Sequence, residues 1–389
     1  MKTFIRGATM TLFGTLLAAG ASLGIAGSAS AAASIPQGTP RAISAFTNHA
    51  VFLQTDKRGG NQILAYDQAA DGTLSAGGTY DTGGHGGVAA ASVVDPLASQ
   101  GSLVLADGGH ILLAVNAGSD TVSLFRVSGD RLALWQIIPS GGQFPTSIAV
   151  HRGLVYVLDA GGTGAVQGYV LVAGTLRPLP GSNRSLGLTN TNPPNFLDAP
   201  GQVGFTPDGS RVIVTTKNSG SDIDVFSVGF AGLLSLQPVA NASATPVPFS
   251  FAFDLAGHLV VTEAGTSDLS VYTLNADDTV TALGSVSDGQ AALCWVTQVG
   301  AWFYGSNAGS ATVSAFQVGT SGAPVLTGQA ASTQAGTTDS AATPNGRFLY
   351  VTNGGAGTVD EFHINSDGTL FEIGMVTGLP SPMEGIAAS

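Results

Sequence analysis

The chain has 389 residues, of which 55 are glycine, 10% are charged and one is cysteine. Aspartate and glutamate outnumber lysine and arginine by 25 to 13, which argues against a general nucleic-acid or anionic-membrane binder, because both need a basic surface. The single cysteine excludes an internal disulfide framework and a multi-cysteine metal cluster. A hydrophobic content of 44% excludes a wholly disordered chain.

The N-terminus has the order of features that is typical of a secretory signal peptide. Lys2 and Arg6 precede an apolar stretch of small residues over about 8–26, and Ala-x-Ala cleavage patterns follow at 29–33. We therefore expect a leader over 1–33, a linker over 34–44, and a secreted or extracytoplasmic protein. Cleavage would leave 11 cations against 25 acids, a net charge of −14.

An uncleaved membrane anchor is the alternative for this stretch. It is disfavoured because Gly and Ala dilute the stretch and small residues follow it directly. No later segment has about 18 uninterrupted apolar residues, so we expect no membrane span after cleavage.

The rest of the chain repeats one pattern seven times: an apolar strand, a turn rich in Gly, Asn or Asp, and an alternating strand that ends on an aromatic residue. These aromatic residues are Tyr66, Phe125, Tyr169, Phe226, Tyr272, Phe316 and Phe362. Most of their intervals are 44–46 residues, and a period of that length with several short strands is typical of a propeller blade. The sequence therefore predicts an all-β, seven-bladed β-propeller with four-stranded antiparallel blades, as one domain over 45–389.

Each repeat can be divided into strands A to D, from the channel outward. In the second repeat we expect them at Gly101–Ala106, His110–Asn116, Thr121–Val127 and Leu132–Ile138. Asp-Gly and Asn-Gly pairs predict A–B turns at 207–209 and 344–346 and C–D turns at 71–72 and 367–368, with the acids shaping turns rather than binding calcium. The two long intervals, 59 and 57 residues, predict inserted D–A loops at about 82–100 and 182–199.

The two ends of the repeat array complement each other. The first repeat has no clear strand A, and Pro382–Ala388 resembles a strand A that no further strand follows. We therefore expect the C-terminal strand to fill the first blade and close the ring, which removes the open sheet edges that promote aggregation. A closed ring of this kind predicts a monomer.

Several of these repeat segments also resemble a known family. The segments 114–127, 201–209, 248–253 and 350–354, together with Ser140-Gly-Gly and Pro145-Thr-Ser, are similar to the seven-bladed lactonase family, which is related to bacterial 6-phosphogluconolactonases and fungal carboxy-muconate lactonizing enzymes. The resemblance extends from about residue 45 to the C-terminus. It implies a propeller fold, and it implies hydrolysis or formation of a lactone as the first functional hypothesis.

Propellers bind ligands over the central channel, on the face formed by the D–A and B–C loops. His85 is the one histidine that the strand assignment places on that face, and an imidazole suits a general acid or base near neutral pH, with a solvated loop histidine beside flexible glycines as the alternative. Glu263 ends a strand B, and Lys217 takes the related place one blade earlier. This pair predicts an acid or base beside an anion clamp, with a plain inter-blade ion pair as the alternative.

Lactone hydrolysis needs an activated water and a donor for the tetrahedral oxyanion. His85 and Glu263 are the catalytic candidates. The substrate-binding candidates are Lys217, Arg184, Asn116 and Asp159. Cys294 is expected to be a buried apolar residue rather than a nucleophile.

The expected partner is a small lactone or carboxylate, without nucleic acid. No cofactor is predicted, and a divalent ion held by Asp or Asn side chains in the channel stays open. Whether the chain is an enzyme also stays open. The alternative is a non-catalytic exported propeller that binds a polysaccharide, a protein or a cell-surface partner.

Overall fold

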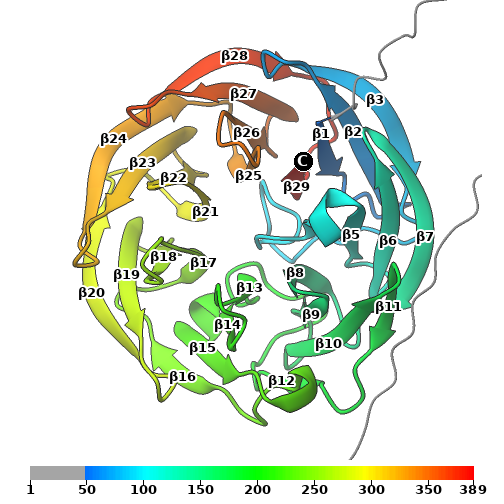
Figure 1. The fold of residues 1–389 in the computed structure, drawn as a ribbon, viewed down its shortest axis with the longest axis vertical. Coiled ribbons are helices and arrows are strands. Elements are labelled where there is room, and N and C mark those ends of the chain that lie inside the picture. Colours follow the sequence, from blue (N-terminus) through cyan, green and yellow to red (C-terminus); the bar gives the residue numbers. More distant parts are fainter. Residues whose placement is uncertain (1–48) are drawn as a thin grey trace, which may run out of the picture. The chain divides into compact units, whose positions relative to one another are not determined.

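The structure, a computed structural model, describes residues 49–389, which form a ring of seven antiparallel sheets (Figure 1). The predicted leader and linker lie outside the described residues. In each blade an inner strand lies beside the channel and an outer strand lies at the rim. From inside to outside, blade 1 has β29 (Ile386–Ala388), β1 (Ala50–Gln54), β2 (Gln62–Gln68) and β3 (Leu74–Asp81), and blade 2 has β4 (Leu103–Ala106), β5 (Ile111–Asn116), β6 (Thr121–Ser128) and β7 (Arg131–Pro139). Blade 3 has β8 (Pro145–His151), β9 (Leu154–Asp159), β10 (Ala165–Val172) and β11 (Thr175–Pro178). Blade 4 has β13 (Gln202–Phe205), β14 (Arg211–Thr215), β15 (Asp222–Ser227) and β16 (Val239–Ala242).

The remaining three blades have the same order. Blade 5 has β17 (Pro248–Phe253), β18 (Leu259–Glu263), β19 (Asp268–Leu274) and β20 (Val280–Ser287). Blade 6 has β21 (Leu293–Val299), β22 (Trp302–Asn307), β23 (Thr312–Val318) and β24 (Pro324–Ser332). Blade 7 has β25 (Thr337–Ala342), β26 (Phe348–Asn353), β27 (Thr358–Ile364) and β28 (Leu370–Val376). Blade 3 carries one further short strand, β12 (Arg184–Ser185), which pairs with β10 beside β11. The predicted seven-bladed propeller is thus confirmed, with this one addition.

The C-terminal strand closes the ring. β29 pairs antiparallel with β1, and Leu53 lies opposite Ile386 in this register. Met383 and Ile386 are buried in the core between blades 1 and 7. The predicted closure is therefore confirmed, and the first blade is built from both ends of the described chain.

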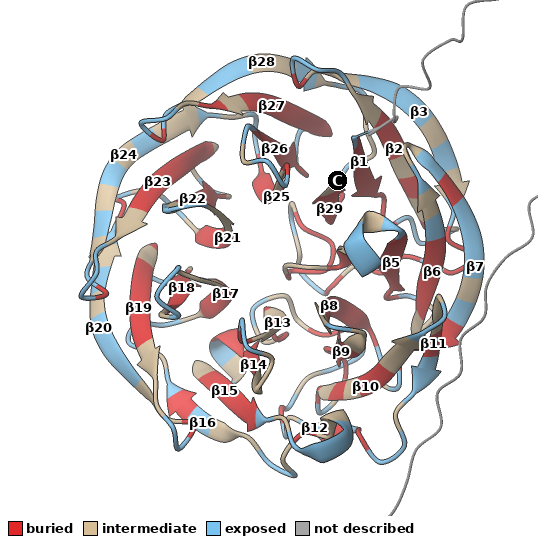
Figure 2. Ribbon diagram, in the orientation of Figure 1, coloured by how far each residue is buried: buried red, intermediate tan, exposed pale blue. Residues whose placement is uncertain are grey.

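Burial decreases from the middle of each blade to its rim, as the strand patterns require. All six residues of β5 are buried, whereas β20 and β24 alternate between half-buried and exposed positions (Figure 2). The aromatic residues that mark the repeats are all buried in the cores between neighbouring blades. The hydrophobic cores thus join each blade to the next one around the ring.

The acidic turn residues behave as turn formers. The Asp71 carboxylate accepts hydrogen bonds from the amide and hydroxyl of Thr73, at 3.1 and 2.8 Å, and these bonds lower the pKa of Asp71. Asp367 makes the same two bonds with Thr369. The helical elements of residues 49–389 are three 3-10 turns of three residues each, and none could cross a membrane.

The first inserted segment, between β3 and β4, crosses the channel. The side chain of Gln100 donates to the carbonyl of Val296 and accepts from its amide, at 2.9 and 3.0 Å, which ties the segment to blade 6. The backbone amide of Gln100 donates to Gly201 beside blade 4 at 3.0 Å, and Ile148 of blade 3 donates to Gly101 at 2.8 Å. The segment therefore spans the ring interior instead of folding back over its own blades.

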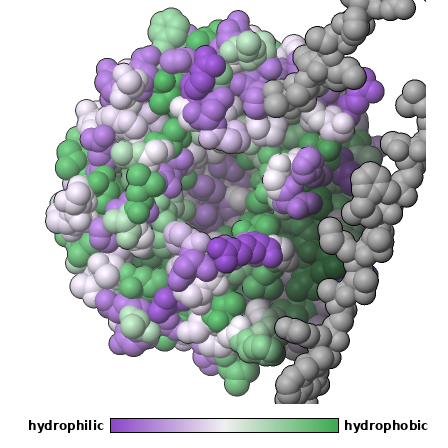
Figure 3. Space-filling model, in the orientation of Figure 1, coloured by the Kyte–Doolittle hydropathy of each residue, from purple (hydrophilic) through white to green (hydrophobic). Residues whose placement is uncertain are grey.

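The second inserted segment, between β12 and β13, pairs with the first. Ala90 donates to the carbonyl of Pro194 at 2.8 Å, and Phe196 donates to the carbonyl of Ala90 at 3.1 Å. In the view of Figure 3 the ring has a hollow at its centre, bordered by both hydrophilic and hydrophobic side chains. The two paired segments supply structure in the channel that the seven repeats do not encode.

Candidate functional site

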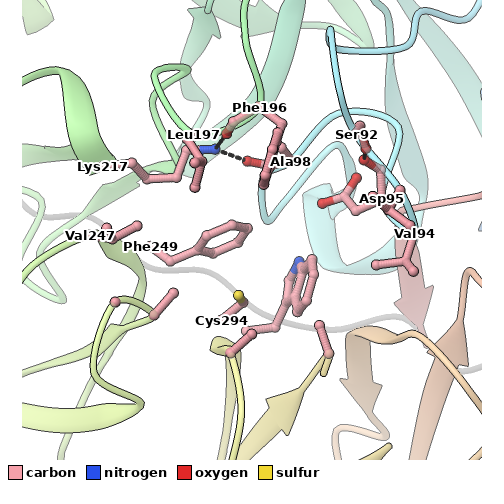
Figure 4. A pocket seen from close by; sticks show the side chains of 16 residues that line it. Ser92, Val94, Asp95, Ala98, Phe196, Leu197, Lys217, Val247, Phe249 and Cys294 are labelled. Carbon is pink, nitrogen blue, oxygen red and sulfur yellow. Dashed lines mark hydrogen bonds between the residues drawn. The ribbon is translucent and has the colours of Figure 1, made fainter. Parts of the chain in front are cut away.

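A cavity of about 210 Å³ lies between the two inserted segments and the inner ends of blades 4, 5 and 6 (Figure 4). Its walls come from D–A segments, B–C loops and the first residues of the inner strands. The lining is apolar apart from Ser92, Asp95, Lys217 and the thiol of Cys294.

The aromatic side of the cavity is formed where two inner strands begin. Phe249 at the start of β17 and Trp295 at the start of β21 pack edge to face, with ring centroids 4.9 Å apart. Both strands shift register at this point, so a bulge reorients their first side chains. The Trp295 indole N–H donates to the carbonyl of Ser99 at 2.8 Å, which fixes the ring against the crossing segment.

Cys294 is the second residue of β21, packs with Phe249 and Trp295, and lines the same cavity. Burial raises the pKa of its thiol to about 12, and the nearby Lys217 only partly opposes this. The thiol therefore stays neutral at neutral pH and is a poor nucleophile. The prediction that Cys294 is a buried residue is confirmed.

Lys217 enters the cavity from the B–C loop of blade 4, where it begins a 3-10 turn with a left-handed φ of 49°. Its ammonium donates to the carbonyls of Ala98 and Phe196, both at 2.6 Å, and lies 5.0 Å from the Phe249 ring centroid. Burial lowers the pKa of Lys217 to about 8, while Asp95 acts in the opposite direction. An ammonium has three N–H groups, so one remains for a ligand.

Asp95, in the crossing segment, points into the cavity from the opposite side (Figure 4). Its two carboxylate oxygens accept from the amides of Leu97 and Ser99, at 2.8 and 2.9 Å. Burial raises the pKa of Asp95 to about 6, although these amides and Lys217 lower it. The ion pairs of residues 49–389 are Arg211–Asp278 and His258–Asp254, so Asp95 and Lys217 face one cavity without touching.

Three further buried acids surround Asp95 in the channel: Asp56 after β1, Asp339 in β25 and Glu384 in the closing segment. Burial raises the pKa of Asp56 and of Asp339 to about 8, and it raises that of Glu384 well above its usual range. Asp56 accepts from the Gln54 side chain at 2.6 Å and from the Glu384 amide at 3.1 Å. No three acids, histidines or cysteines within 49–389 are arranged to hold a metal ion.

His85 lies away from this cavity, on an exposed part of the first inserted segment. It borders two shallow hollows, one together with Arg58 and Asp120 and the other together with Lys57. Its backbone amide donates to the hydroxyl of Ser119 at 3.0 Å. The structure therefore does not bring His85 together with Lys217.

Glu263 and Arg184 are engaged within the fold. The Glu263 carboxylate is fully buried and accepts from four hydroxyl groups, those of Ser243, Thr245, Ser270 and Tyr272. The Arg184 guanidinium donates to four carbonyl groups, those of Gly181, Asn183, Leu234 and Ser235. The expected pairing of Glu263 with Lys217 is not observed, because each side chain has closer partners of its own.

Asn116 and Asp159 are also buried at the ends of their B strands. The Asn116 amide donates to Thr121 and Ser123, at 3.1 and 2.8 Å, and its oxygen accepts from Asn61 at 3.2 Å. Burial raises the pKa of Asp159 to about 7. Neither side chain lines the central cavity, so Lys217 is the one predicted site residue that does.

Sequence reasoning missed Asp95, Phe249 and Trp295 as cavity residues. Asp95 belongs to the inserted loop, and the repeat pattern gives no position for it. The insertion itself was visible as a 59-residue interval between Tyr66 and Phe125. Extra length at the ligand-binding face was therefore the available indication, but the residue could not be selected from it.

Comparisons with known proteins bear on the fold. No family model matches the chain, and no curated protein matches its sequence significantly. Among solved structures, a "putative 6-phosphogluconolactonase" from Bacteroides uniformis is 16% identical with a TM-score of 0.69, over 88% of this chain and 99% of that one. A periplasmic gluconolactonase from Pseudomonas aeruginosa is 14% identical with a TM-score of 0.68, over 87% and 98%.

A second "putative 6-phosphogluconolactonase", from Bacteroides fragilis, is 17% identical with a TM-score of 0.67, over 89% of this chain and 99% of that one. Identities this low establish the architecture and leave the chemistry open. The chain therefore has the fold of a lactonase-like seven-bladed propeller.

Proposed function

We propose that the chain is an exported lactonase-like propeller that hydrolyses or forms a small lactone in the central cavity, between Asp95 and Lys217. The observation that carries the proposal is a buried carboxylate and a buried ammonium that face one largely apolar cavity without touching. The structural neighbours named as gluconolactonases support the choice of lactone chemistry. The periplasmic neighbour and the leader pattern support export.

In the proposed hydrolysis, Asp95 is the general base. Its carboxylate takes a proton from a water molecule while the water oxygen bonds to the acyl carbon of the lactone. The remaining N–H of Lys217 donates to the carbonyl oxygen as that oxygen becomes an oxyanion. The ring C–O bond then breaks, the leaving oxygen takes the proton from Asp95, and a hydroxy acid is released.

The surroundings favour this division of roles. A pKa of about 6 leaves Asp95 ionised near neutral pH yet basic enough to accept a proton. Lys217 has a pKa of about 8 and keeps its charge there. Because the lining is mainly apolar, the attraction between the ammonium and the developing oxyanion is screened less than in water. Lactone formation would use the same groups in reverse.

The test is a lactone-hydrolysis screen on the mature protein with Asp95→Asn and Lys217→Met, beside His85→Ala on the exposed loop. We expect kcat/KM to fall about 10²–10⁴-fold in Asp95→Asn, the range for loss of a general base, and about 10²-fold in Lys217→Met. His85→Ala should retain turnover. Loss of turnover in His85→Ala alone would move the site to the outer loop.

The same screen also tests the alternative function, a propeller that binds a ligand without catalysis. Ligand binding without turnover on any lactone would identify a non-catalytic propeller. Export has its own measurement, which is the N-terminal sequence of the protein recovered outside the cytoplasm. It should begin just after Ala31 or Ala33 if the leader is cleaved as the sequence predicts.

A further inference from the structure

We propose that the ligand of the central cavity has an apolar body and a single polar end, as in a lactone that carries a short alkyl or aryl substituent, and is not a sugar lactone. The lactone part of this inference rests on the proposed function. The apolar body is inferred from the cavity alone, from its volume and from the hydrogen-bonding groups that it leaves free.

The polar side chains of the lining are mostly satisfied by the protein itself. The hydroxyl of Ser92 donates to the backbone carbonyl of Asp95. The Trp295 indole donates to Ser99 at 2.8 Å. Lys217 has two of its N–H groups on backbone carbonyls. What remains for a ligand is one N–H of Lys217, the free lone pairs of Asp95 and a neutral thiol.

Three backbone amides in the walls from blades 5 and 6 are engaged as well. Ala264 donates to Val247 at 2.9 Å, Gly265 donates to Pro246 at 3.1 Å, and Ala308 donates to Ala292 at 3.0 Å. These bonds hold the B–C loops of blades 5 and 6 against the preceding D–A loops. A hydroxyl-rich ligand would therefore find few donors along these walls.

The opposite part of the lining is suited to an apolar group. Phe249 and Trp295 present aromatic surface, and Val94, Leu197 and Ala308 add aliphatic surface. A dry cavity of about 150 Å³ holds benzene, so about 210 Å³ accommodates roughly eight heavy atoms. That volume fits a five- or six-membered lactone ring with a short substituent, whereas a phosphorylated sugar exceeds it.

Charge also disfavours a phosphosugar. Lys217 is the one cation that lines the cavity within the described residues, and Asp95 lies across from it. Asp95, with a pKa of about 6, is ionised near neutral pH. A dianionic phosphate needs several cations, finds one here, and would be repelled by the Asp95 carboxylate. Each sugar hydroxyl buried without a partner would weaken binding on the order of tenfold.

The experiment measures binding separately from turnover. Trp135→Phe and Trp302→Phe leave Trp295 as the only tryptophan, so its fluorescence reports on the cavity. The ligands are γ-lactones with alkyl substituents of increasing length, the matching 2-alkylcyclopentanones, which cannot be hydrolysed, and glucono-δ-lactone. We expect affinity to rise roughly fourfold for each added CH₂ until the cavity is full. Glucono-δ-lactone should bind at least about 100-fold more weakly.

A matched pair of variants locates the site. Ala308→Leu fills the cavity, whereas Ala301→Leu adds the same group to an exposed turn on the other side of blade 6. We expect the longest cyclopentanone to bind at least tenfold more weakly to Ala308→Leu and unchanged to Ala301→Leu. Ala264→Val is a smaller filling change if Ala308→Leu lowers the melting temperature.

The outcomes separate this inference from the proposed function. Tight binding of alkylcyclopentanones without hydrolysis of any lactone keeps the apolar ligand and overturns the lactonase proposal. Hydrolysis of glucono-δ-lactone with affinity equal to that of the alkyl lactones keeps the lactonase proposal and overturns the apolar ligand. Equal binding to Ala308→Leu and Ala301→Leu also overturns it, because the ligand would then lie elsewhere.

Discussion

Glu263 in the wall of blade 5 and Asp95 in the segment that crosses the channel are both buried carboxylates, but their surroundings differ. Glu263 accepts from four hydroxyl groups, three of them from serine or threonine, and does not line the central cavity. Asp95 accepts from two backbone amides and faces an apolar cavity with a lysine on its far side. One carboxylate is saturated by the protein, and the other retains capacity for a ligand.

The same contrast holds in part between the wall of the ring and its interior, although burial also raises the pKa of Asp159, at the end of β9 in the wall, to about 7. The wall is made of repeated blades in which polar groups such as Asn116 and Arg184 are paired within the fold. The interior is made of the two inserted segments, the closing segment and the B–C loop of blade 4, where Asp95, Glu384 and Lys217 have strongly shifted pKa values. Burial alone therefore does not indicate function in this molecule. The useful criterion is a buried polar group that keeps free hydrogen-bonding capacity after its partners within the fold are counted.

The largest expected effect is a loss of stability when one strand is removed from the wall of the ring. Deleting Ser381–Ser389 removes β29 and exposes the edge of β1, and it also removes the buried side chains of Met383 and Ile386. Burying two such side chains contributes about 3–6 kcal/mol. We expect the melting temperature to fall by more than about 10 °C in circular dichroism. An unchanged melting temperature would contradict closure by this strand.

The wall was predictable from sequence because it repeats. Seven similar segments fix the period, and the buried aromatic of each strand C fixes the register, so the blades, the turns at Asp71 and Asp367 and the closing strand were all predicted correctly. Each blade packs residues of the same kinds at the same strand positions. If the strands of one repeat are assigned wrongly, comparison with the other six repeats corrects the assignment.

The interior was not predictable because it occurs once. The crossing segment is fixed by contacts distant in sequence, such as Gln100 with Val296, and no local pattern encodes them. Glu263 was selected because its side chain is longer than those at equivalent strand ends. The four hydroxyl groups that bind it come from neighbouring strands, and the sequence does not show that they converge. Lys217 was placed on the correct loop, but its partners were not foreseen.

A smaller effect tests the comparison of the two carboxylates directly. Glu263→Ala leaves four hydroxyl groups, those of Ser270 and Tyr272 on buried residues, without their shared acceptor, and we expect a loss of roughly 3 kcal/mol in the free energy of unfolding. Asp95→Asn should change that free energy by less than about 1 kcal/mol, because it removes a buried charge and only one of the two bonds, since the amide oxygen of asparagine can still accept the other. Urea denaturation measures both.

Glu372→Ala is the control for this pair, because Glu372 is an exposed glutamate at the rim of blade 7. It should change the free energy of unfolding by less than about 0.5 kcal/mol. Equal destabilisation in Glu263→Ala and Asp95→Asn would remove the distinction between a saturated and an available carboxylate. Catalytic turnover per folded molecule in Glu263→Ala would complete the comparison, and it should remain close to that of the unchanged protein.

The smallest expected effect concerns pH and the buried acids that adjoin the channel. Burial raises the pKa values of Asp56 and Asp339 to about 8 and that of Asp95 to about 6, whereas the unfolded values lie near 3.8. The folded protein therefore binds more protons than the unfolded chain between about pH 4 and pH 8. These groups stabilise the fold fully at the acidic end of that window, and the stabilisation is lost as pH rises through it.

We expect the melting temperature to fall by several degrees between about pH 5 and pH 8. Asp339→Asn with Glu384→Gln should flatten this slope, because neither replacement can lose a proton. A melting temperature that rises over the same range would show that the wall, not the interior, controls the titration. Activity should follow the opposite course, since kcat/KM falls below about pH 6 as Asp95 becomes protonated. The interior would then be most stable at a pH where its proposed base no longer works, as expected for buried acids that are kept for chemistry at a cost in stability.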